Sequence, residues 1–377
     1  MSNPYSELDD FCFWSRAMSW PAPGQIDPVV GKAEILPGQK VATMGSCFAQ
    51  HLSAHIRSSG LHYFVTEPAP AEMDETTARA RNYGVFSARY GNVYTVRQAV
   101  QLLDRALGAF APAEDVWTQG DRYVDAFRPR IEPDGFASAE DTRETAREHL
   151  ACVRKCFTEC DWLVFTLGLT EAWRSRRDGA IYPLAPGVSG GCFDPSLHEF
   201  VNFTAEEVQS DLIALIGKLR KINAGIRILL TVSPVPLAAT YERRHVLVST
   251  TYSKAALRVA ADAAERQLDG VIYFPAYEII TSPAAGGRYY ADDLRQVTQV
   301  GVKHVMKLFG RHFFPRAGDL AAADPESPRL EAAIRRDAEI VCDEETIDRA
   351  LRESGFGELD KSLAHGAHPP QIPDPIP

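Results

Sequence analysis

Short apolar runs alternate along the chain with longer segments in which apolar residues recur every three or four positions. The apolar, β-prone runs lie at 41–44, 62–65, 161–166, 226–232 and 271–274. The segments with helical spacing end near residues 56, 107, 160, 223, 268 and 314. Strands and helices that alternate in this way build a parallel sheet with right-handed crossovers. The pattern therefore predicts an α/β fold, a three-layer α/β/α sandwich with a central parallel sheet.

This alternation fills residues 36–315, and the two ends of the chain differ from it. Residues 1–35 hold aromatic side chains among prolines, which predicts an ordered arm packed across the domain. The aromatic residues of this arm are Tyr5, Phe11, Phe13, Trp14 and Trp20. Residues 316–377 are poorer in apolar residues, and we expect amphipathic helices over 325–352 and a proline-rich, extended tail from 364. Within the domain, residues 174–203 are expected to form a long loop that could cover a site.

The charge balance limits the classes of partner. Of the 377 residues 24% are charged, the net charge is −10 and the pI is about 5.5, so no broad cationic surface for nucleic acid is expected. No run of 18 apolar residues is present, which argues against a membrane span. The first ten residues lack the basic and apolar segments of a secretory signal, so we expect a cytoplasmic protein.

The cysteines predict neither disulfides nor a metal site. There are seven, an odd number, and no Cys-x-x-Cys pair occurs. Cys152, Cys156 and Cys160 recur every fourth residue and share one face of a predicted helix, as buried reduced thiols do. We therefore expect no metal and no cofactor.

Ser46 is the first candidate for chemistry. It follows a short apolar run and Gly45, and a helical pattern begins directly after it. The carboxyl ends of parallel strands are where ligands bind in such folds, and a helix amino terminus there offers N–H groups to a negative charge. A serine in this place is a nucleophile or a plain helix N-cap.

The string Gly45-Ser46-Cys47-Phe48-Ala49 resembles the signature of the GSCFA family, which is similar to the SGNH/GDSL hydrolases. The resemblance implies the same sandwich, with Ser46 as nucleophile and its backbone N–H as an oxyanion donor. It also implies two further donors. By similarity these are Gly84, in the pattern Asn82-x-Gly84, and Thr170, which follows Gly168 where the SGNH pattern has asparagine.

The last SGNH block contains an aspartate and, three residues later, the histidine that deprotonates the serine. The sequence here resembles it through Asp293-x-x-Gln296, with glutamine in the histidine position. A glutamine amide cannot accept and return a proton near neutral pH. Three explanations remain open: an engineered change, a pocket that has lost hydrolysis, or a base supplied elsewhere. The histidines that could supply it are His51, His198 and His245.

The sequence thus predicts a serine esterase or acyltransferase that acts on a small-molecule or saccharide ester. Cys47, which shares a predicted helical face with His51, is a second possible nucleophile. The alternative is a degenerate, SGNH-like protein that binds a saccharide or an acyl group without turnover. Aromatic residues that could stack on a sugar ring are Tyr83, Tyr90, Trp173 and Tyr290.

Overall fold

The computed structural model describes residues 3–22, 24–31, 33–314, 343–344 and 346–347. Its centre is a parallel sheet of four strands in the order β1-β4-β8-β9. These strands are β1 (Val41–Gly45), β4 (Trp162–Leu167), β8 (Arg227–Val232) and β9 (Val271–Tyr273). On the outer side of β1, Tyr63 forms a parallel bridge with Val41, in the run where the sequence predicts a second strand.

The sheet order fixes where a ligand can bind. Counting the extended segment at Tyr63, the order along the sheet is second, first, third, fourth and fifth in the chain. In open sheets of this order the crevice opens at the carboxyl ends of the first and third strands, where successive connections leave to opposite faces. Those strands are β1 and β4, which pair through Gly45 and Thr166.

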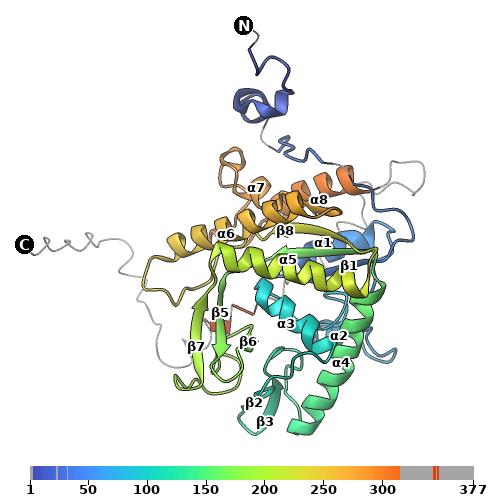
Figure 1. Ribbon diagram of the computed structural model, residues 1–377, viewed down its shortest axis with the longest axis vertical. Helices are drawn as coiled ribbons and strands as arrows, with labels where there is room; N and C mark the ends of the chain where they lie inside the picture. Colours follow the sequence, from blue (N-terminus) through green and yellow to red (C-terminus); the bar gives the residue numbers. More distant parts are fainter. Residues whose placement is uncertain (1–2, 23, 32, 315–342, 345, 348–377) are drawn as a thin grey trace, which may run out of the picture.

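Helices cover both faces of the sheet, so the predicted three-layer sandwich is confirmed (Figure 1). One face packs against α1 (Ala49–Ser58), α7 (Ala276–Thr281) and α8 (Gln299–Phe313). The other packs against α3 (Val96–Ala106), α4 (Ala139–Glu159), α5 (Ala205–Ile222) and α6 (Val246–Gln267). The short α2 (Glu75–Ala80) has no buried residue. Among the described helices, none combines the length and apolar character that crossing a bilayer requires.

Side-chain caps set the starts of the long helices. Thr95, Ser138 and Thr298 each accept a hydrogen bond from a backbone N–H in the first turn of α3, α4 and α8. At α5, Thr204 and Glu207 form a complete capping box. These caps hold the connections between strand ends and helices in fixed positions.

Two small antiparallel sheets lie beside the sandwich (Figure 1). A hairpin joins β2 (Val116–Gln119) to β3 (Arg122–Asp125). The second sheet has the order β6-β5-β7. Its strands are β5 (Glu171–Ser175), β6 (Ile181–Tyr182) and β7 (His198–Asn202). Residues 174–203, expected to form a loop, therefore hold two strands that pair with β5.

The amino-terminal arm differs from the prediction. It forms a 3-10 turn (Asp10–Cys12) and a π-helical turn (Ser15–Ser19), and it extends away from the sandwich (Figure 1). Four aromatic side chains expected to pack are exposed: Tyr5, Phe11, Trp14 and Trp20. The packing prediction is wrong for them; in the described part of the arm, contact with the domain is made by later residues such as Asp27, which pairs with His312 at 2.8 Å, and Ile35. Most of 325–352 and the whole tail from 364 lie outside the described residues.

The tight approach of β1 to β4 gives a first prediction. Gly45 has φ 136°, and a side chain there would overlap the Thr166 carbonyl oxygen and lie 2.8 Å from the Thr166 nitrogen. Gly45→Ala should therefore lower the free energy of unfolding by about 2–4 kcal/mol, measured by urea denaturation.

Gly108→Ala is the matched control. Gly108 also has a positive φ, 73°, but a side chain there meets nothing within 4 Å. This variant should cost about 1 kcal/mol, the strain of the left-handed backbone alone. Equal losses for the two variants would contradict the close approach at Gly45.

Candidate functional site

Ser46 stands directly after β1, at the crevice that the sheet order predicts. Its backbone N–H donates to the Thr166 carbonyl at 3.1 Å and so continues the ladder between β1 and β4. The chain then turns, and α1 begins at Ala49. Only 3% of Ser46 is exposed.

The Ser46 hydroxyl is buried and has no hydrogen-bond partner in the described part of the chain. Phe48 occupies the N-cap position of α1, and no side chain caps that helix. The helix-cap interpretation of Ser46 is therefore wrong. A buried hydroxyl without a partner costs about 1–3 kcal/mol, so the fold retains it at an energetic cost.

Gly168 brings the end of β4 against Ser46. A side chain at Gly168 would lie 3.0 Å from the Ser46 Cβ and 2.9 Å from the Tyr94 carbonyl oxygen. That carbonyl accepts the Gly168 N–H at 3.2 Å, and the Val93 N–H donates to the Gly45 carbonyl at 2.8 Å. The loop that precedes α3 is thus tied to both strand ends beside Ser46.

Helix α6 fixes the segment after β4 from the other side. The Ser253 hydroxyl accepts the Thr170 N–H at 3.0 Å, and Lys254 Nζ donates to the Gly168 carbonyl at 2.8 Å. Lys254 is 1% exposed, and its burial lowers the pKa of the ammonium to about 8. Lys254 was not among the residues predicted from the sequence. The pattern that could have indicated it is its place three positions before Leu257, on the apolar face of the helix.

Two residues near the carboxyl terminus close the same edge of the sheet. Asp343 accepts the Asn92 side-chain N–H at 2.9 Å, and its own backbone N–H donates to the Tyr94 hydroxyl at 3.1 Å. Glu344 pairs with the Arg295 guanidinium at 2.9 Å. Burial is the main cause that raises the pKa of both carboxyl groups. Neither residue was among the site residues predicted from the sequence.

The final block turns Arg295 inward. Arg295 donates to the Pro236 carbonyl at 3.2 Å besides pairing with Glu344. Asp293 and Gln296 are exposed, and Asp293 Oδ1 accepts the backbone N–H groups of Arg295 and Gln296 at 3.0 and 2.9 Å. Burial opposes these two bonds, yet the pKa of Asp293 is lowered. No hydrogen bond in the described residues joins Asp293 or Gln296 to the Ser46 hydroxyl.

Two of the predicted oxyanion donors have other partners in the structure. The Ser46 N–H is engaged by Thr166, as described above. The Thr170 hydroxyl donates to Asn202 Oδ1 at 2.7 Å, and the Asn202 amide donates to Glu242 at 3.1 Å. An oxyanion at Ser46 would have to compete with these bonds.

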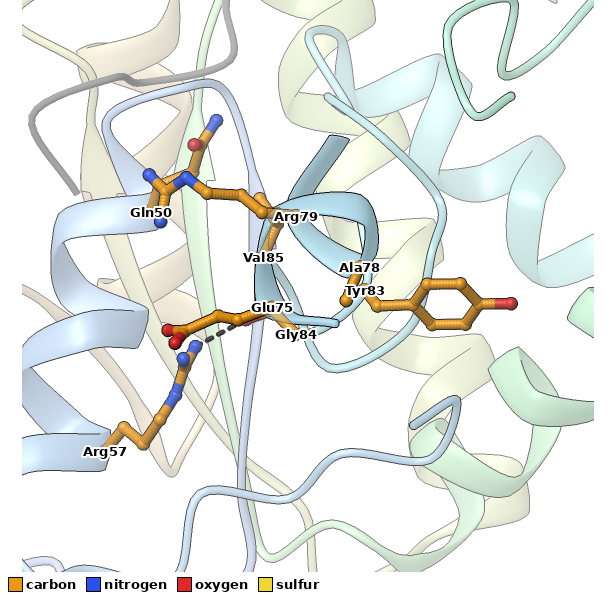
Figure 2. Close-up of a pocket in the computed structure, with 8 residues that line it drawn as sticks. All are labelled: Gln50, Arg57, Glu75, Ala78, Arg79, Tyr83, Gly84 and Val85. Atoms are coloured by element: carbon orange, nitrogen blue, oxygen red, sulfur yellow. Dashed lines mark hydrogen bonds between the residues drawn. The ribbon is translucent and has the colours of Figure 1, made fainter. Parts of the chain in front are cut away.

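Gly84, the third predicted donor, lies in a pocket of about 100 Å³ between α1 and α2. Its carbonyl accepts a hydrogen bond from the Arg57 guanidinium, which reaches over from the end of α1 (Figure 2). The other lining residues are Gln50, Glu75, Ala78, Arg79, Tyr83 and Val85. Ser46 does not line this pocket. The residue of this loop region that bonds to the strand end beside Ser46 is Val93, whose N–H donates to the Gly45 carbonyl.

Comparison with known proteins adds the family. The sequence profile of the GSCFA family matches residues 40–309. The chain belongs to the GSCFA family. Comparison with curated proteins gives no match.

Three solved structures are similar to this GSCFA chain. An acetyl esterase variant with acetate is 12% identical, with a TM-score of 0.33, over 72% of this chain and 95% of that one. An acetyl-xylooligosaccharide esterase from Geobacillus is 13% identical, with a TM-score of 0.29, over 74% and 96%. An acetyl xylan esterase from Butyrivibrio proteoclasticus is 12% identical, with a TM-score of 0.27, over 74% and 64%.

The histidines named as alternative bases make contacts away from the Ser46 hydroxyl. His198 is fixed at both ring nitrogens, 3.0 Å from Glu114 Oε2 and 3.2 Å from the Asp194 backbone nitrogen. His245 is exposed and accepts the Leu247 N–H at the start of α6. His51 is buried and packs edge-on against Phe48, and its burial lowers the pKa to about 4. An imidazole with such a pKa is neutral at pH 7 but is a weak base.

The thiols of Cys152, Cys156 and Cys160 are shifted away from reactivity. Cys156 and Cys160 are buried free thiols, and Cys152 is partly exposed. Burial raises the pKa of all three, that of Cys160 to about 12. Cys47 is also buried and forms no disulfide within the described residues. Among the described residues, no group of histidine, cysteine and carboxylate side chains has the arrangement of a metal site.

Two buried histidines of α1 predict acid sensitivity. Burial lowers the pKa of His51 and His55 from 6.5 to about 4, so the unfolded chain takes up their protons first as the pH falls. Their contribution to stability is present above pH 6.5 and is lost toward pH 4, at roughly 2 kcal/mol each by pH 5. Urea midpoints at pH 7.5 and pH 5 should show this loss.

His55→Phe should reduce the pH dependence, because His55 already stacks on Phe314 and an aromatic ring is retained. The exposed His245 supplies the control, and His245→Asn, which keeps a capping side chain, should leave the pH dependence unchanged. An undiminished loss of stability in His55→Phe would contradict the burial of a neutral imidazole at this position.

Proposed function

We propose that this GSCFA protein is a serine esterase or acyltransferase in which Ser46 attacks an acyl ester. The observation that carries the proposal is the Ser46 hydroxyl, which is buried and without a partner at the junction of β1 and β4. Structural serines satisfy their hydroxyl groups, so an unsatisfied one at the ligand-binding edge of a parallel sheet fits a nucleophile. The acyl carbonyl of a substrate would give this oxygen its partner.

The surroundings of Ser46 support chemistry on a carbonyl group. Burial excludes bulk water, so donors directed at the developing negative charge act more strongly than in solvent. The oxyanion donors we propose are the backbone N–H groups of Ser46 and Gly84 and the hydroxyl of Thr170. Because Ser46 and Thr170 hold other partners, substrate binding must exchange those hydrogen bonds. Water as acceptor gives hydrolysis, and a sugar hydroxyl gives transfer.

An aromatic cluster favours an acylated saccharide as substrate. Trp173 of β5 lies three residues after Thr170, and its ring meets Tyr241 edge to face at 4.9 Å and Phe193 at 5.1 Å. Tyr241 is 62% exposed, so the cluster offers a ring face to solvent beside the segment that follows β4. Sugar rings stack on such faces. Trp173 and Tyr90 were both among the aromatic residues expected to stack on a sugar ring. Tyr90 is buried and has no ring face open to a ligand.

The second candidate function is saccharide or acyl binding without turnover. Gln296 in the histidine position favours it, as does the engagement of the Thr170 hydroxyl by Asn202. Both candidates use the same crevice and differ only in whether Ser46 becomes acylated.

A fluorophosphonate probe separates the two functions. It reacts with activated serines, so the wild type should be labelled on the peptide that contains Ser46, and Ser46→Ala should lose that label. The measurement is fluorescence in a gel together with peptide mapping by mass spectrometry. Ser59→Ala is the control, since it removes another buried hydroxyl, at the far end of α1, and should keep the label.

Equal labelling of the wild type and Ser46→Ala would remove Ser46 from the mechanism. Absence of label, combined with thermal stabilisation of both proteins by an acetylated oligosaccharide, would establish the binding function instead.

A further inference from the structure

We infer that Lys254 is the general base that deprotonates Ser46, in the role for which the final block lacks a histidine. The inference rests on the proposed function and names a residue that neither the sequence motif nor the family match assigns. It stands on three observations: the position of Lys254 across Gly168 from Ser46, its burial without a carboxylate partner, and the unpartnered serine hydroxyl.

Gly168 links the two side chains. Its carbonyl accepts the Lys254 ammonium at 2.8 Å, and its Cα faces Ser46, where an added side chain would meet the Ser46 Cβ at 3.0 Å. Because Gly168 has no side chain, nothing of that residue separates the amine from the hydroxyl beyond the peptide group itself. In the reaction we infer, Nζ leaves the Gly168 carbonyl and turns to Ser46 Oγ. Catalytic hydrogen bonds are often long before substrate binds.

The end of β1 lies next to α6. Ala42 and Met44 of β1 belong to the core layer that contains Leu257 and Ala261 of α6. Ser46 follows directly after this strand. Lys254 lies one helical turn before Leu257 on the same face of α6. Both residues are thus at the carboxyl end of one core layer.

The burial of Lys254 favours the neutral amine that a base requires. An ammonium has three donors, and in the described residues Lys254 makes a single hydrogen bond and no ion pair within 4 Å. The other charged or titratable groups that face it are Glu344 of the carboxyl-terminal segment, Cys47 after β1, and Arg295 before α8. Glu344 favours the ammonium, whereas Arg295 opposes it and holds the Glu344 carboxylate at 2.9 Å. Burial outweighs these effects and lowers the pKa of Lys254 to about 8.

The proton balance of the reaction is complete with this residue. The neutral Nζ takes the proton of Ser46 Oγ while that oxygen bonds to the acyl carbon and the carbonyl electrons move to their oxygen. When this intermediate collapses, the bond to the leaving alcohol breaks, and the Lys254 ammonium protonates the departing oxygen. Water then attacks the acyl-enzyme, giving its proton to Lys254, and Ser46 Oγ regains that proton as the acid leaves.

The test measures the rate of fluorophosphonate labelling at Ser46 against pH, which needs no knowledge of the natural substrate. If Lys254 is the base, the rate follows the fraction of neutral lysine. With a pKa of about 8 the rate should rise about fiftyfold from pH 6 to pH 8 and level off above pH 9. A rate that levels off near pH 7, as with an ordinary histidine base, would overturn the inference.

Variants identify the group that titrates. Lys254→Met removes the amine and Lys254→Arg keeps a cation that cannot deprotonate, so both should lower the labelling rate by about 100-fold or more. Lys218→Met is the matched control. Lys218 of α5 pairs with Asp104 of α3 at 2.6 Å, so this variant should be labelled at the wild-type rate. Methylamine should partly restore labelling of Lys254→Ala, in proportion to the free amine. A purely structural lysine gives no such rescue.

The outcomes separate the inference from the function it rests on. Labelling of Ser46 at the wild-type rate in folded Lys254→Met would overturn the role of Lys254 and leave Ser46 as the nucleophile. Loss of the wild-type label itself would overturn both. If Gln296→His accelerated labelling by orders of magnitude, the final block would be the site of the base, and the inference about Lys254 would fail. If the lysine variants do not fold, the wild-type pH profile alone still decides.

Discussion

The close approach of β1 and β4 at their carboxyl ends determines the arrangement of the candidate site. Gly45 leaves no room for a side chain beside the Thr166 backbone, and Gly168 leaves none beside Ser46 and Tyr94. A side chain at either position would force the neighbouring atoms to shift. The loop before α3 and the amino-terminal part of α6 then attach to this junction through backbone groups, as the bonds of Val93 and Lys254 show.

Polar groups buried at this junction oppose folding, and the apolar layers on both sides compensate. The Ser46 hydroxyl lacks a partner, and Lys254, Asp343 and Glu344 are buried ionisable residues. Each disfavours the folded state, because a buried ionisable group loses hydration that a few hydrogen bonds restore only in part. A site that accepts such costs is typical of chemistry rather than packing, since natural proteins give up stability at functional positions.

The sandwich and the position of Ser46 between β1 and α1 could be predicted from the sequence because their signals are local. Strand runs, helix caps at Thr95 and Thr204, and the string around Ser46 lie within a few residues of one another. Lys254 and Glu344 could not be found in this way, since only the tertiary fold buries them. The aromatic arm shows the opposite error: apolar composition predicted packing, but Trp14 and Trp20 are exposed. Gly84 was selected for its pattern, whereas the backbone contacts to the strand ends come from Val93 and Tyr94.

The central claim is that Ser46 becomes covalently acylated by an ester. The most direct measurement is rapid acid quenching of the protein during incubation with an activated acetyl ester, followed by peptide mapping by mass spectrometry. The account predicts an acetyl group on the Ser46 oxygen that appears within the first turnover and is absent from Ser46→Ala. An acetyl group on Cys47 instead, or an unmodified Ser46 peptide while the ester is consumed at a rate that needs the folded protein, would contradict it.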